Sequence, residues 1–552
     1  MKTLKLIQSD SYLRPYASAI EGRYNYAIAQ EKKLTGGQKL SEWANGHMFF
    51  GLHKVGKKWV LREWAPNATA IYLIGDCNDW KKNEDYRLQP TDNGVWEITL
   101  AEKMLKHEQL YKLLVEWQGG SGERIPSYAR RVVQDPQTKL FSAQVWAPAG
   151  DKITKTTKIK GYKRRKAGDP LFIYECHIGM SSEEEKVNSY DEFRRDVLPR
   201  IAKLGYNCLQ IMAIQEHPYY GSFGYHVSNY FAPSSRFGTP DDLKWLIKQA
   251  HKHKIAVVMD LVHSHFVANL NEGLNELDGS DHQYSPSGSA GNHPYWGSKL
   301  FDYSKPEVVN FLLSNIRYWI EEFHFDGFRF DAIKYIYFGD TQASAEFWEW
   351  YMSELKAYKP DIYCVGECWS GEAEILVYYG AMNCFNFAMS GAEGQAANAA
   401  KGQSLAAFVK YIESYQDKVQ RANPEGIPMQ FLSNHDQDRI GGAFATASNM
   451  KMAANLYLLA PGSSFIYYGE EIGMISKGGN NSDPAKRIAM KWEAKNIYEG
   501  HCYLPPENTP VDETSYHYPS VAEQEADANS ILNYYKTAME LRNRFPSIAR
   551  GK

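Results

Sequence analysis

The sequence predicts a parallel (β/α)8 barrel, the TIM-barrel architecture, preceded by a small β-sandwich domain. After Pro170, eight apolar runs of strand character alternate with segments of helical periodicity, which is typical of a parallel sheet covered by helices. Between residues 45 and 147, shorter strand-like runs are interrupted by Gly, Asn, Asp and Pro, a pattern that favours a sandwich. The length of 552 residues is enough for two or three domains.

The barrel strands are predicted from the eight apolar runs, and the barrel helices from the amphipathic segments between them. The runs occupy residues 171–178, 207–214, 255–265, 327–332, 362–369, 384–389, 428–436 and 464–471. A last helical segment, 531–545, follows the eighth run. Eight strand–helix units are therefore present, and eight such units close a parallel barrel.

Changes in composition set the other domain boundaries. Residues 1–44 are predicted to form an N-terminal helical arm, and residues 45–147 form the sandwich. A polar and basic linker is expected at 148–170, before the barrel at 171–552. Within the barrel, residues 263–305 are rich in Gly, Ser, Asn, Asp and His and are too long for a plain loop, which predicts a small lobe inserted after the third strand.

Charge and cysteine content exclude several classes of protein. The formal net charge is −3, from 62 basic and 65 acidic side chains, so neither nucleic acid nor an anionic membrane is expected as a partner. No apolar run is long enough to cross a bilayer, and the N-terminus lacks the sustained apolar core of a signal peptide. The seven cysteines are scattered without a C-x-x-C pair, which favours reduced thiols and a cytoplasmic location.

Aromatic residues make up 14% of the chain, including 38 Tyr and 14 Trp. Part of this excess must build the core, but Tyr and Trp also suit the flat faces of sugars, because their rings are apolar and carry a polar atom at the rim. In the sandwich, Trp80, Trp96 and Trp117 either stack on sugars or pack in the core, and we favour the core.

Polar side chains gather at the ends of four predicted barrel strands. A single Asp at a strand end is usually a turn former or a helix cap. In a (β/α)8 barrel, however, the C-terminal ends of the strands meet at one mouth and build the active site. The residues concerned are Asp260, His263 and His265 on the third strand, Arg329 and Asp331 on the fourth, Glu367 on the fifth, and Asn434, His435 and Asp436 on the seventh.

These residue types favour cleavage of a glycosidic bond. One carboxylate attacks or stabilises the anomeric carbon, and a second protonates the leaving oxygen. Arg329 lies two residues before Asp331 on the same strand face, so its fixed positive charge favours an ionised Asp331 as nucleophile. Glu367 has apolar and aromatic neighbours, which suits a proton donor. Asp436 is a third acid that can hold sugar hydroxyls and distort the ring.

Other chemistries find no support in the sequence. A G-x-S-x-G elbow, a G-x-x-x-x-G-K-[ST] loop and a dinucleotide-binding fingerprint are all missing. His263 and His265 are spaced as H-x-H, but no Cys or carboxylate partner lies at metal-ligand spacing nearby. A structural or substrate-contacting role is therefore favoured for them, and no catalytic metal or cofactor is predicted.

Four motifs together carry a family resemblance. DLVHSH (260–265), GFRFDAIK (327–334), GECW (366–369) and FLSNHD (431–436) resemble the four signature regions of the α-amylase superfamily, glycoside hydrolase family 13. The resemblance extends from about residue 45 to the end of the chain. It implies a retaining mechanism through a covalent glycosyl–enzyme intermediate.

The same resemblance assigns roles to individual residues. It implies Asp331 as nucleophile, Glu367 as general acid/base and Asp436 as stabiliser of the transition state. It also implies a first sugar subsite, in which Tyr225 stacks on the sugar and other side chains support it. The supporting residues are Asp260, His265, Arg329 and His435.

The two halves of the chain resemble different members of this superfamily. Residues 1–331 resemble glycogen-type 1,4-α-glucan branching enzymes, in motifs such as GERIPSYARRVVQD and IQEHPYYGSFGYHVSNYFAPSSRFGTPDDLK, and the sandwich resembles a family-48 carbohydrate-binding module. Residues 332–552 resemble α-amylases. Lys334 is placed like the amylase lysine that touches the leaving-side sugars, and Trp369 is a further candidate for sugar binding. The family's usual C-terminal β-domain is expected to be absent.

The resemblance implies an enzyme that acts on α-1,4-glucans such as glycogen, amylose and starch. We expect a branching enzyme, because this resemblance covers more of the chain and includes the accessory domain. An endo-acting α-amylase and a non-catalytic glucan-binding protein are the alternatives. A structural calcium ion near the inserted lobe is compatible with the family, and its candidate oxygen ligands are Asn269, Asp278 and Asp281.

Overall fold

The computed structural model describes most of the chain. The described residues are 7–8, 11–148, 171–182, 184, 186–336, 341–369, 377–378, 382–444, 446–476, 483–493 and 518–551. Nearly all of the predicted linker, residues 149–170, lies outside these described residues.

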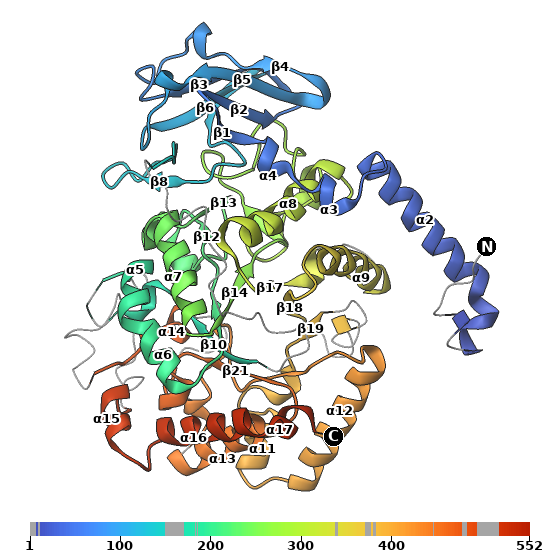
Figure 1. Cartoon of the computed structure of the whole chain (residues 1–552), viewed down its shortest axis with the longest axis vertical. Helices are drawn as coiled ribbons and strands as arrows, with labels where there is room; N and C mark the ends of the chain where they lie inside the picture. Colours follow the sequence, from blue (N-terminus) through green and yellow to red (C-terminus); the bar gives the residue numbers. More distant parts are fainter. Residues whose placement is uncertain are drawn as a thin grey trace.

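An eight-stranded parallel barrel forms the centre of the molecule (Figure 1). Strand β10 pairs with both β11 and β21, and an isolated parallel bridge between Phe385 and Met429 joins β19 to β20, so the ring of strands closes. Each predicted run overlaps one barrel strand, and the predicted fold class is confirmed. In ring order the strands are β10 (Phe172–Cys176), β11 (Cys208–Ile211), β14 (Ala256–Leu261), β17 (Gly327–Phe330), β18 (Tyr363–Gly366), β19 (Asn383–Cys384), β20 (Met429–Gln430) and β21 (Ser463–Tyr467).

Helices surround the barrel, and the sequence determines where they begin. Helix α7 starts with a capping box in which Thr239 and Asp242 bond each other's backbone N–H groups, and Pro240 occupies the first turn. Its apolar face, which includes Leu243 and Leu246, is buried. The longer barrel helices are α6 (Leu198–Leu204), α7 (Pro240–Lys252), α8 (Pro306–Phe323), α9 (Thr341–Tyr358), α12 (Leu405–Ala422), α13 (Ala447–Leu458) and α16 (Ile531–Arg544); shorter ones are α5 (Tyr190–Glu192), α11 (Gln395–Ala400), α14 (Asp483–Lys486), α15 (Val521–Ala526) and α17 (Pro546–Arg550).

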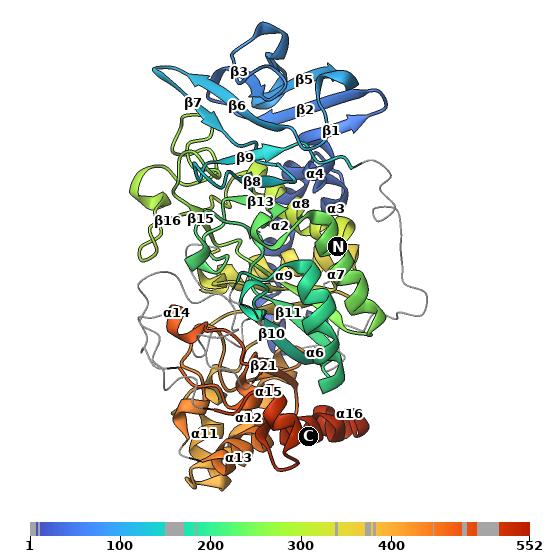
Figure 2. The ribbon, with the colours of Figure 1, turned by 90° about the vertical axis from the view of Figure 1, so that its left-hand side faces the viewer.

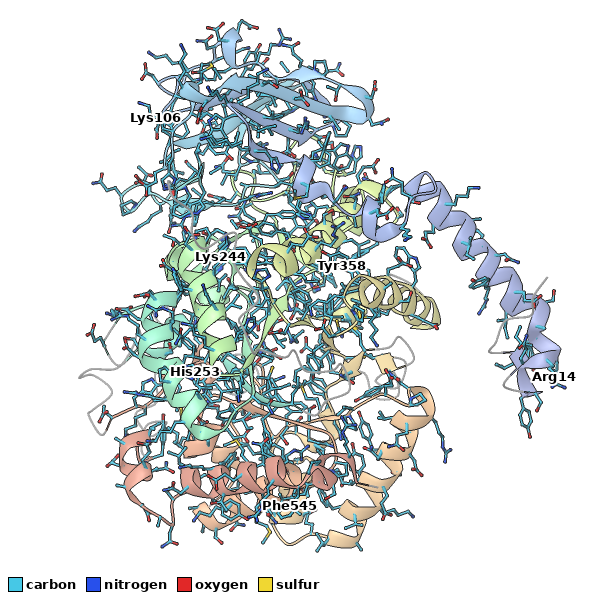
Figure 3. The ribbon with its side chains drawn as sticks, in the orientation of Figure 1. Arg14, Lys106, Lys244, His253, Tyr358 and Phe545 are labelled. Atoms are coloured by element: carbon cyan, nitrogen blue, oxygen red, sulfur yellow. The ribbon has the colours of Figure 1, made fainter. Side chains whose placement is uncertain are left out.

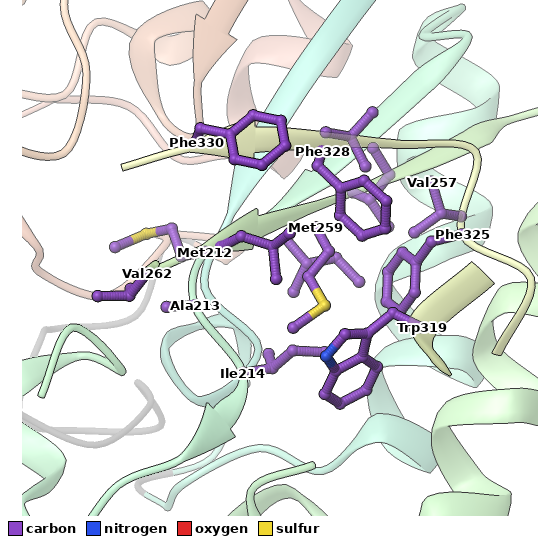
Figure 4. Packing of buried hydrophobic residues seen from close by; sticks show 14 of the residues in the cluster. Met212, Ala213, Ile214, Val257, Met259, Val262, Trp319, Phe325, Phe328 and Phe330 are labelled. Atoms are coloured by element: carbon purple, nitrogen blue, oxygen red, sulfur yellow. The ribbon is translucent and has the colours of Figure 1, made fainter. Parts of the chain in front are cut away.

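Large apolar side chains fill the space between the strands and helix α8. Met259 on β14 and Phe328 on β17 are fully buried, and Trp319 of α8 packs in the same cluster (Figure 4). Trp319 is also 6.0 Å from Phe325, centroid to centroid, in an edge-to-face arrangement. This packing fixes β14 and β17, the two strands that carry Asp260 and Arg329. None of the described helices combines the length and apolarity needed to cross a lipid bilayer.

Two antiparallel sheets form the sandwich at one end of the molecule (Figure 2). Its inner positions are apolar and buried, and include Leu61, Ile71, Leu73 and Leu113. One sheet contains β1 (Gly51–Val55), β2 (Lys58–Trp64), β5 (Val95–Ala101) and β4 (Gln89–Pro90); the other contains β3 (Ala68–Gly75), β6 (Leu110–Trp117), β9 (Phe141–Gln144) and β8 (Val132–Gln134), with β7 (Gly120–Arg124) paired to β6.

The N-terminal segment is helical, and its last turns are attached to the barrel. Helix α2 (Ala17–Thr35) projects from the body of the molecule (Figure 1), whereas the short helices α3 (Leu40–Trp43) and α4 (Gly46–Phe49) lie against α9 and α8. Glu321 of α8 accepts hydrogen bonds from His47 of α4, at 2.8 Å, and from Tyr358 of α9, labelled in Figure 3. These bonds and Arg317 outweigh burial and lower the pKa of Glu321 to about 2.

The sandwich is bonded directly to the inserted lobe, which contains the two-stranded sheet β15 (His265–Val267) and β16 (Ser298–Leu300). The backbone N–H of Asn67 donates to Asp278 Oδ2 at 3.0 Å, and its side-chain amide donates to the Asp278 carbonyl at 3.0 Å. Arg124 Nε donates to the carbonyl of Glu276 at 3.0 Å. Because backbone groups of both parts take part, these bonds define one relative position of sandwich and lobe.

The three sandwich tryptophans considered for sugar stacking have different surroundings. Trp96 is buried and donates to the Ala65 carbonyl at 3.0 Å, as expected for a core residue. Trp117 packs against Gly279 of the inserted lobe, in the contact between the two parts of the chain. Trp80 is 38% exposed and its indole N–H donates to Asp76. Core packing therefore describes Trp96, while Trp117 serves the contact with the lobe.

We predict that Gly279→Ala weakens this contact. Gly279 has a φ of +84°, and a Cβ there would lie 2.2 Å from the Trp117 ring. Backbone strain and overpacking together should lower the free energy of unfolding by about 2–4 kcal/mol. The control is Gly288→Ala in the same lobe, where φ is +64° but the Cβ would meet nothing within 4 Å. It should lose only about 1 kcal/mol. Equal losses for both variants in denaturant unfolding would contradict the close packing at Trp117.

Candidate active site

A buried arginine connects three carboxylates at the mouth of the barrel. Arg329, the third residue of β17, is 1% exposed. Its Nη1 lies 2.8 Å from Asp260 Oδ1 and 2.8 Å from Asp331 Oδ1, and its Nη2 lies 2.8 Å from Glu367 Oε2. The three acids come from β14, from the end of β17 and from the end of β18. The structure thus brings together four residues that the sequence analysis placed at strand ends.

Glu367 is held where burial favours its protonated form. Its Oε2 accepts a hydrogen bond from the backbone N–H of Ala332 at 3.0 Å. Ala332 has a φ of 45°, in the left-handed region. Burial, helped by the neighbouring charges of Asp331 and Asp436, raises the pKa of Glu367 to about 8, although Arg329 opposes the shift. At neutral pH this carboxyl group therefore carries a proton that it can donate.

Asp260 and Tyr225 connect Arg329 to His435: Asp260 contacts Arg329, and Tyr225 contacts His435. The Tyr225 hydroxyl donates to Asp260 Oδ2 at 2.7 Å, and the Tyr225 ring stacks on His435 with centroids 4.9 Å apart and planes 8° apart. Burial raises the pKa of Asp260 to about 6, while Arg329 opposes this shift. The bond to Asp260 fixes the orientation of the Tyr225 ring, which lines the cavity described below.

His435 and Asp436 form a second charged group at the end of β20. His435 Nδ1 donates to Glu175 Oε1 at 2.8 Å, and its Nε2 lies 3.0 Å from Asp436 Oδ2. Burial alone would lower the pKa of His435, but Asp436 and Glu175 raise it to about 10. Desolvation alone would raise the pKa of Asp436, but His435 and Arg487 hold it below its ordinary value. Asp436 is therefore ionised.

Two residues of this second group were not singled out from the sequence. Glu175 lies on β10, within the first predicted strand, and is 1% exposed. Arg487 Nη2 lies 2.6 Å from Asp436 Oδ1 and 3.3 Å from Asp483 Oδ2. Two features of the sequence could have indicated them. Glu175 is a carboxylate inside an apolar strand, and Arg487 belongs to the basic pair that begins KRIAMKW, after the eighth strand.

The remaining strand-end residues divide between the site and the scaffold. His265 Nε2 lies 2.9 Å from the Tyr225 carbonyl and the ring lines the cavity. Asn434 also lines it, and its side-chain oxygen accepts from the Asp436 N–H at 3.0 Å. His263 is buried against Asn315, whose Oδ1 is 3.0 Å from its Nε2, so His263 has the structural role.

These groups surround a cavity of about 540 Å³, a volume suited to a ligand of several rings. Four acidic side chains, one arginine and several aromatic rings face it. Lys334 is not among the lining residues; its Nζ lies over the Trp369 ring at 4.1 Å from the centroid. The lining residues are Tyr219, Gly221, Ser222, Tyr225, His226, His265, Trp296, Asp331, Glu367, Trp369, Phe387, Asn434, Asp436, Gln437, Asp483 and Arg487.

Trp296 is a lining residue that the sequence analysis missed. It comes from the inserted lobe and stacks on His293, with ring centroids 3.9 Å apart and planes 6° apart. It also lies 4.9 Å from His265, centroid to centroid. Trp296 and Trp369 are each 38% exposed. The cavity therefore has two accessible indole rings, one from the lobe and one beside Glu367.

The candidate calcium ligands form hydrogen bonds within the protein. Asp278 accepts from Asn67 and from Ser280, and Asp281 Oδ2 accepts from the Gly288 N–H at 2.8 Å. Asn269 donates to Glu272 at 3.1 Å. A calcium ion in the lobe stays a prediction.

Among the described residues, one group of His, Cys, Asp and Glu side chains is compact enough to share a cation: Glu175, Asp260 and His435. These side chains already neutralise one another, Arg329 and Asp436. We therefore assign them to the ion-pair networks.

Two protein families match most of this chain. Residues 195–284 and 297–551 match the alpha-amylase family, described as "Alpha amylase, catalytic domain". The chain belongs to the alpha-amylase family. Residues 49–137 also match "Carbohydrate-binding module 48 (Isoamylase N-terminal domain)", which coincides with the sandwich. The amylase-family match includes Arg329, Glu367 and Asp436.

Curated relatives of this alpha-amylase family member are called 1,4-alpha-glucan-branching enzymes. The one from Dictyostelium discoideum is 40% identical over 336 residues, covering 60% of this chain and 48% of that protein. The one from Yarrowia lipolytica is 42% identical over 347 residues, covering 60% and 48%. The Arabidopsis thaliana enzyme 2-2, chloroplastic/amyloplastic, is 43% identical over 337 residues, covering 60% and 41%. The chain spans about half the length of the curated relatives it matches.

Several solved structures share this fold. Eubacterium rectale Amy13B superposes with a TM-score of 0.62 at 23% identity, covering 71% of this chain and 82% of that one. A pullulanase from Paenibacillus barengoltzii gives 0.69 at 17% identity, covering 94% and 85%. The alpha-amylase from H. orenii gives 0.58 at 25% identity, covering 70% and 84%.

We predict that Asp331→Asn lowers the pKa of Glu367. The substitution removes a neighbouring negative charge that disfavours ionisation of Glu367. A fall of about 1–2 pH units is expected. Carbon-13 NMR of the carboxyl group measures this pKa directly. Asp436→Asn is the matched comparison and should lower it less, because the Asp436 charge contributes less to the shift. An unchanged or higher pKa in Asp331→Asn would contradict the proposed coupling.

Proposed function

We propose that this chain cleaves α-1,4-glucosidic bonds with retention and transfers the cut chain to a glucan 6-hydroxyl, as a 1,4-α-glucan branching enzyme. The observation that carries the cleavage chemistry is the single guanidinium of Arg329, which holds Asp331 and Glu367 side by side at the barrel mouth. The branching outcome is supported by the relatives at 40–43% identity. The sandwich that matches a carbohydrate-binding module supports an α-glucan partner.

The proposed reaction assigns one task to each acid. Asp331 attacks the anomeric carbon while Glu367 transfers its proton to the leaving glycosidic oxygen, which gives a glycosyl–enzyme ester and a free chain end. A 6-hydroxyl of a second glucan then loses its proton to Glu367 and displaces Asp331, which forms the new linkage and restores both carboxyl groups. Ionised Asp436 accepts hydrogen bonds from sugar hydroxyls, and Tyr225 stacks on the sugar.

Branching differs from hydrolysis only in the second step. A sugar hydroxyl must reach the ester before water does, so the enzyme needs a surface that orients an acceptor glucan. The two accessible indoles, Trp296 and Trp369, offer such a surface at the cavity. Trp296 is held by its stack on His293 and Trp369 by the Lys334 ammonium over its ring, so both rings are oriented before the acceptor arrives.

Hydrolysis by an α-amylase is the second candidate. Lys334 and Trp369, two residues of the half of the chain that resembles α-amylases, contact each other. The solved alpha-amylase from H. orenii is 25% identical to this chain. A glucan-binding protein without turnover is the third. For location we retain the cytoplasm as a proposal, supported by the scattered cysteines of the sequence, which form no C-x-x-C pair. No cofactor is proposed.

Proton NMR of the products from amylose decides between these functions. We expect the α-1,6 anomeric signal to grow with little increase in reducing ends. Growth of reducing ends alone would replace branching by hydrolysis, and no change in either would leave a binding protein. Asp331→Asn should abolish the chemistry, with a loss of at least about a thousandfold, because the ester can no longer form. It should still bind glycogen in a sedimentation assay.

We predict that Trp296→Ala shifts the products toward hydrolysis. Loss of one stacking surface should weaken acceptor binding by about 0.5–1.5 kcal/mol, so the ratio of branching to hydrolysis should fall about 2- to 12-fold. The control is Tyr295→Ala, since Tyr295 is the neighbouring residue, is 78% exposed and does not line the cavity. A change in total cleavage with an unaltered product ratio would place Trp296 outside the acceptor site.

A further inference from the structure

Glu175 is a buried carboxylate that the proposed reaction does not use. It lies in β10, and only its Oε1 makes hydrogen bonds: it accepts from His435 Nδ1 at 2.8 Å and from Gln210 Nε2 at 3.2 Å. Within the described part of the chain, its Oε2 has no hydrogen-bond partner. A buried, half-bonded carboxylate destabilises a fold, so stability alone gives no reason for this residue.

The surroundings of His435 determine which protonation state of its ring is stable. One ring nitrogen faces Glu175 and the other faces Asp436. A neutral imidazole has only one N–H, so one of these two contacts would then bring a lone pair against a carboxylate. The imidazolium avoids this at both contacts: it donates from Nδ1 to Glu175, and its Nε2, which forms no hydrogen bond among the described residues, makes an ion pair with Asp436 Oδ2 at 3.0 Å.

The ring is also fixed in position. Tyr225 stacks on one of its faces, and Arg487 Nε donates to the His435 carbonyl at 3.1 Å. The other ionisable groups near it are Asp260, whose carboxylate belongs to the same compact group, and His177, whose pKa burial lowers well below its ordinary value. His177 therefore adds no positive charge, and the charge of His435 depends on its two carboxylates.

We propose that Glu175 is a positioning residue that keeps His435 an imidazolium and, through it, keeps the Asp436 carboxylate directed into the cavity. The path runs from β10 to the Asp436 carboxylate through one ring: Glu175 Oε1, His435 Nδ1, His435 Nε2 and Asp436 Oδ2. The raised pKa of His435, about 10, agrees with this arrangement. The consequence for catalysis rests on the proposed glucan cleavage.

Glu175→Gln tests the proposal, because it removes the charge and keeps the size of the side chain. The pKa of His435 in the ligand-free protein should fall by about 1–3 units from its starting value near 10. It can be followed by nitrogen-15 NMR of labelled histidine, with the resonance assigned by its loss in His435→Gln. Loss of the Glu367 proton, with a pKa of about 8, sets the alkaline limb of kcat/KM in the wild type. In Glu175→Gln this limb should move lower once His435 titrates below Glu367, because neutral His435 no longer holds Asp436 in place. Activity at pH 6 should stay within about fivefold of wild type.

The control is Asp326→Asn, which alters a second buried carboxylate–histidine pair outside the cavity. Asp326 Oδ2 lies 2.8 Å from His251 Nε2, and both side chains are buried. This variant should lose stability without moving the alkaline limb. Glu175→Asp keeps the charge and should restore most of the wild-type profile, which also covers the case in which Glu175→Gln fails to fold.

Two outcomes would overturn the proposal. One is an unchanged pKa of His435 in Glu175→Gln, and the other is a loss of activity that is uniform with pH and is matched by Asp326→Asn. The NMR measurement needs no substrate. An absence of glucan turnover in the wild type would therefore refute the proposed function and leave the assignment of Glu175 to be decided by the His435 titration.

Discussion

The site depends on the cost of burying one guanidinium. Arg329 is almost completely removed from water, and an isolated charge in that position would destabilise the barrel by several kcal/mol. Three carboxyl groups, one from each of three successive strand ends, contact the guanidinium at 2.8 Å and offset this cost. The geometry that satisfies Arg329 also places Asp331 and Glu367 next to each other. The pairing that stabilises the cation therefore creates the arrangement of acids that the chemistry uses.

A second network keeps the protonation states of the acids apart. Glu367 is neutral near pH 7 because burial dominates its surroundings, whereas Asp436 is ionised because His435 and Arg487 contact it directly. Two carboxyl groups on one cavity thus differ in charge, because Glu367 is more strongly desolvated and shares the Arg329 cation with Asp260 and Asp331, whereas Asp436 contacts both His435 and Arg487. Tyr225 joins the networks, since it bonds Asp260 on one side and stacks on His435 on the other.

Much of this arrangement was predictable from the sequence, because strand ends in a parallel barrel must converge. Eight apolar runs gave the strands, and the polar residues after them gave Arg329, Asp331, Glu367 and Asp436. Pairing between distant segments was not predictable in the same way. Glu175 sits in a strand whose sequence indicates burial but not a partner 260 residues away. Arg487 comes directly after the short helix α14, in a part of the sequence that carries no periodicity.

The aromatic residues show the same limit. Composition indicated an excess of Tyr and Trp, but it does not say which rings face solvent. Trp296 reaches the cavity because His293, three residues earlier, supports it from behind, and Trp117 leaves the sandwich surface because Gly279 of the lobe lies against it. Both placements depend on contacts that form only after the lobe has folded. The sequence contains the residues but no periodic signal for such contacts.

The bonds between Asn67 and Asp278 have a bearing on how such a chain can change in evolution or by engineering. An accessory domain that is connected only by a flexible linker can be replaced by another domain without loss of contacts. Here the lobe that supplies Trp296 is also the surface on which the sandwich rests. A chain shortened by removal of the sandwich would lose the contacts that hold the inserted lobe and, with it, Trp296. Trimming would thus alter which products form, and any recombination that swaps the sandwich must also carry over the matching lobe.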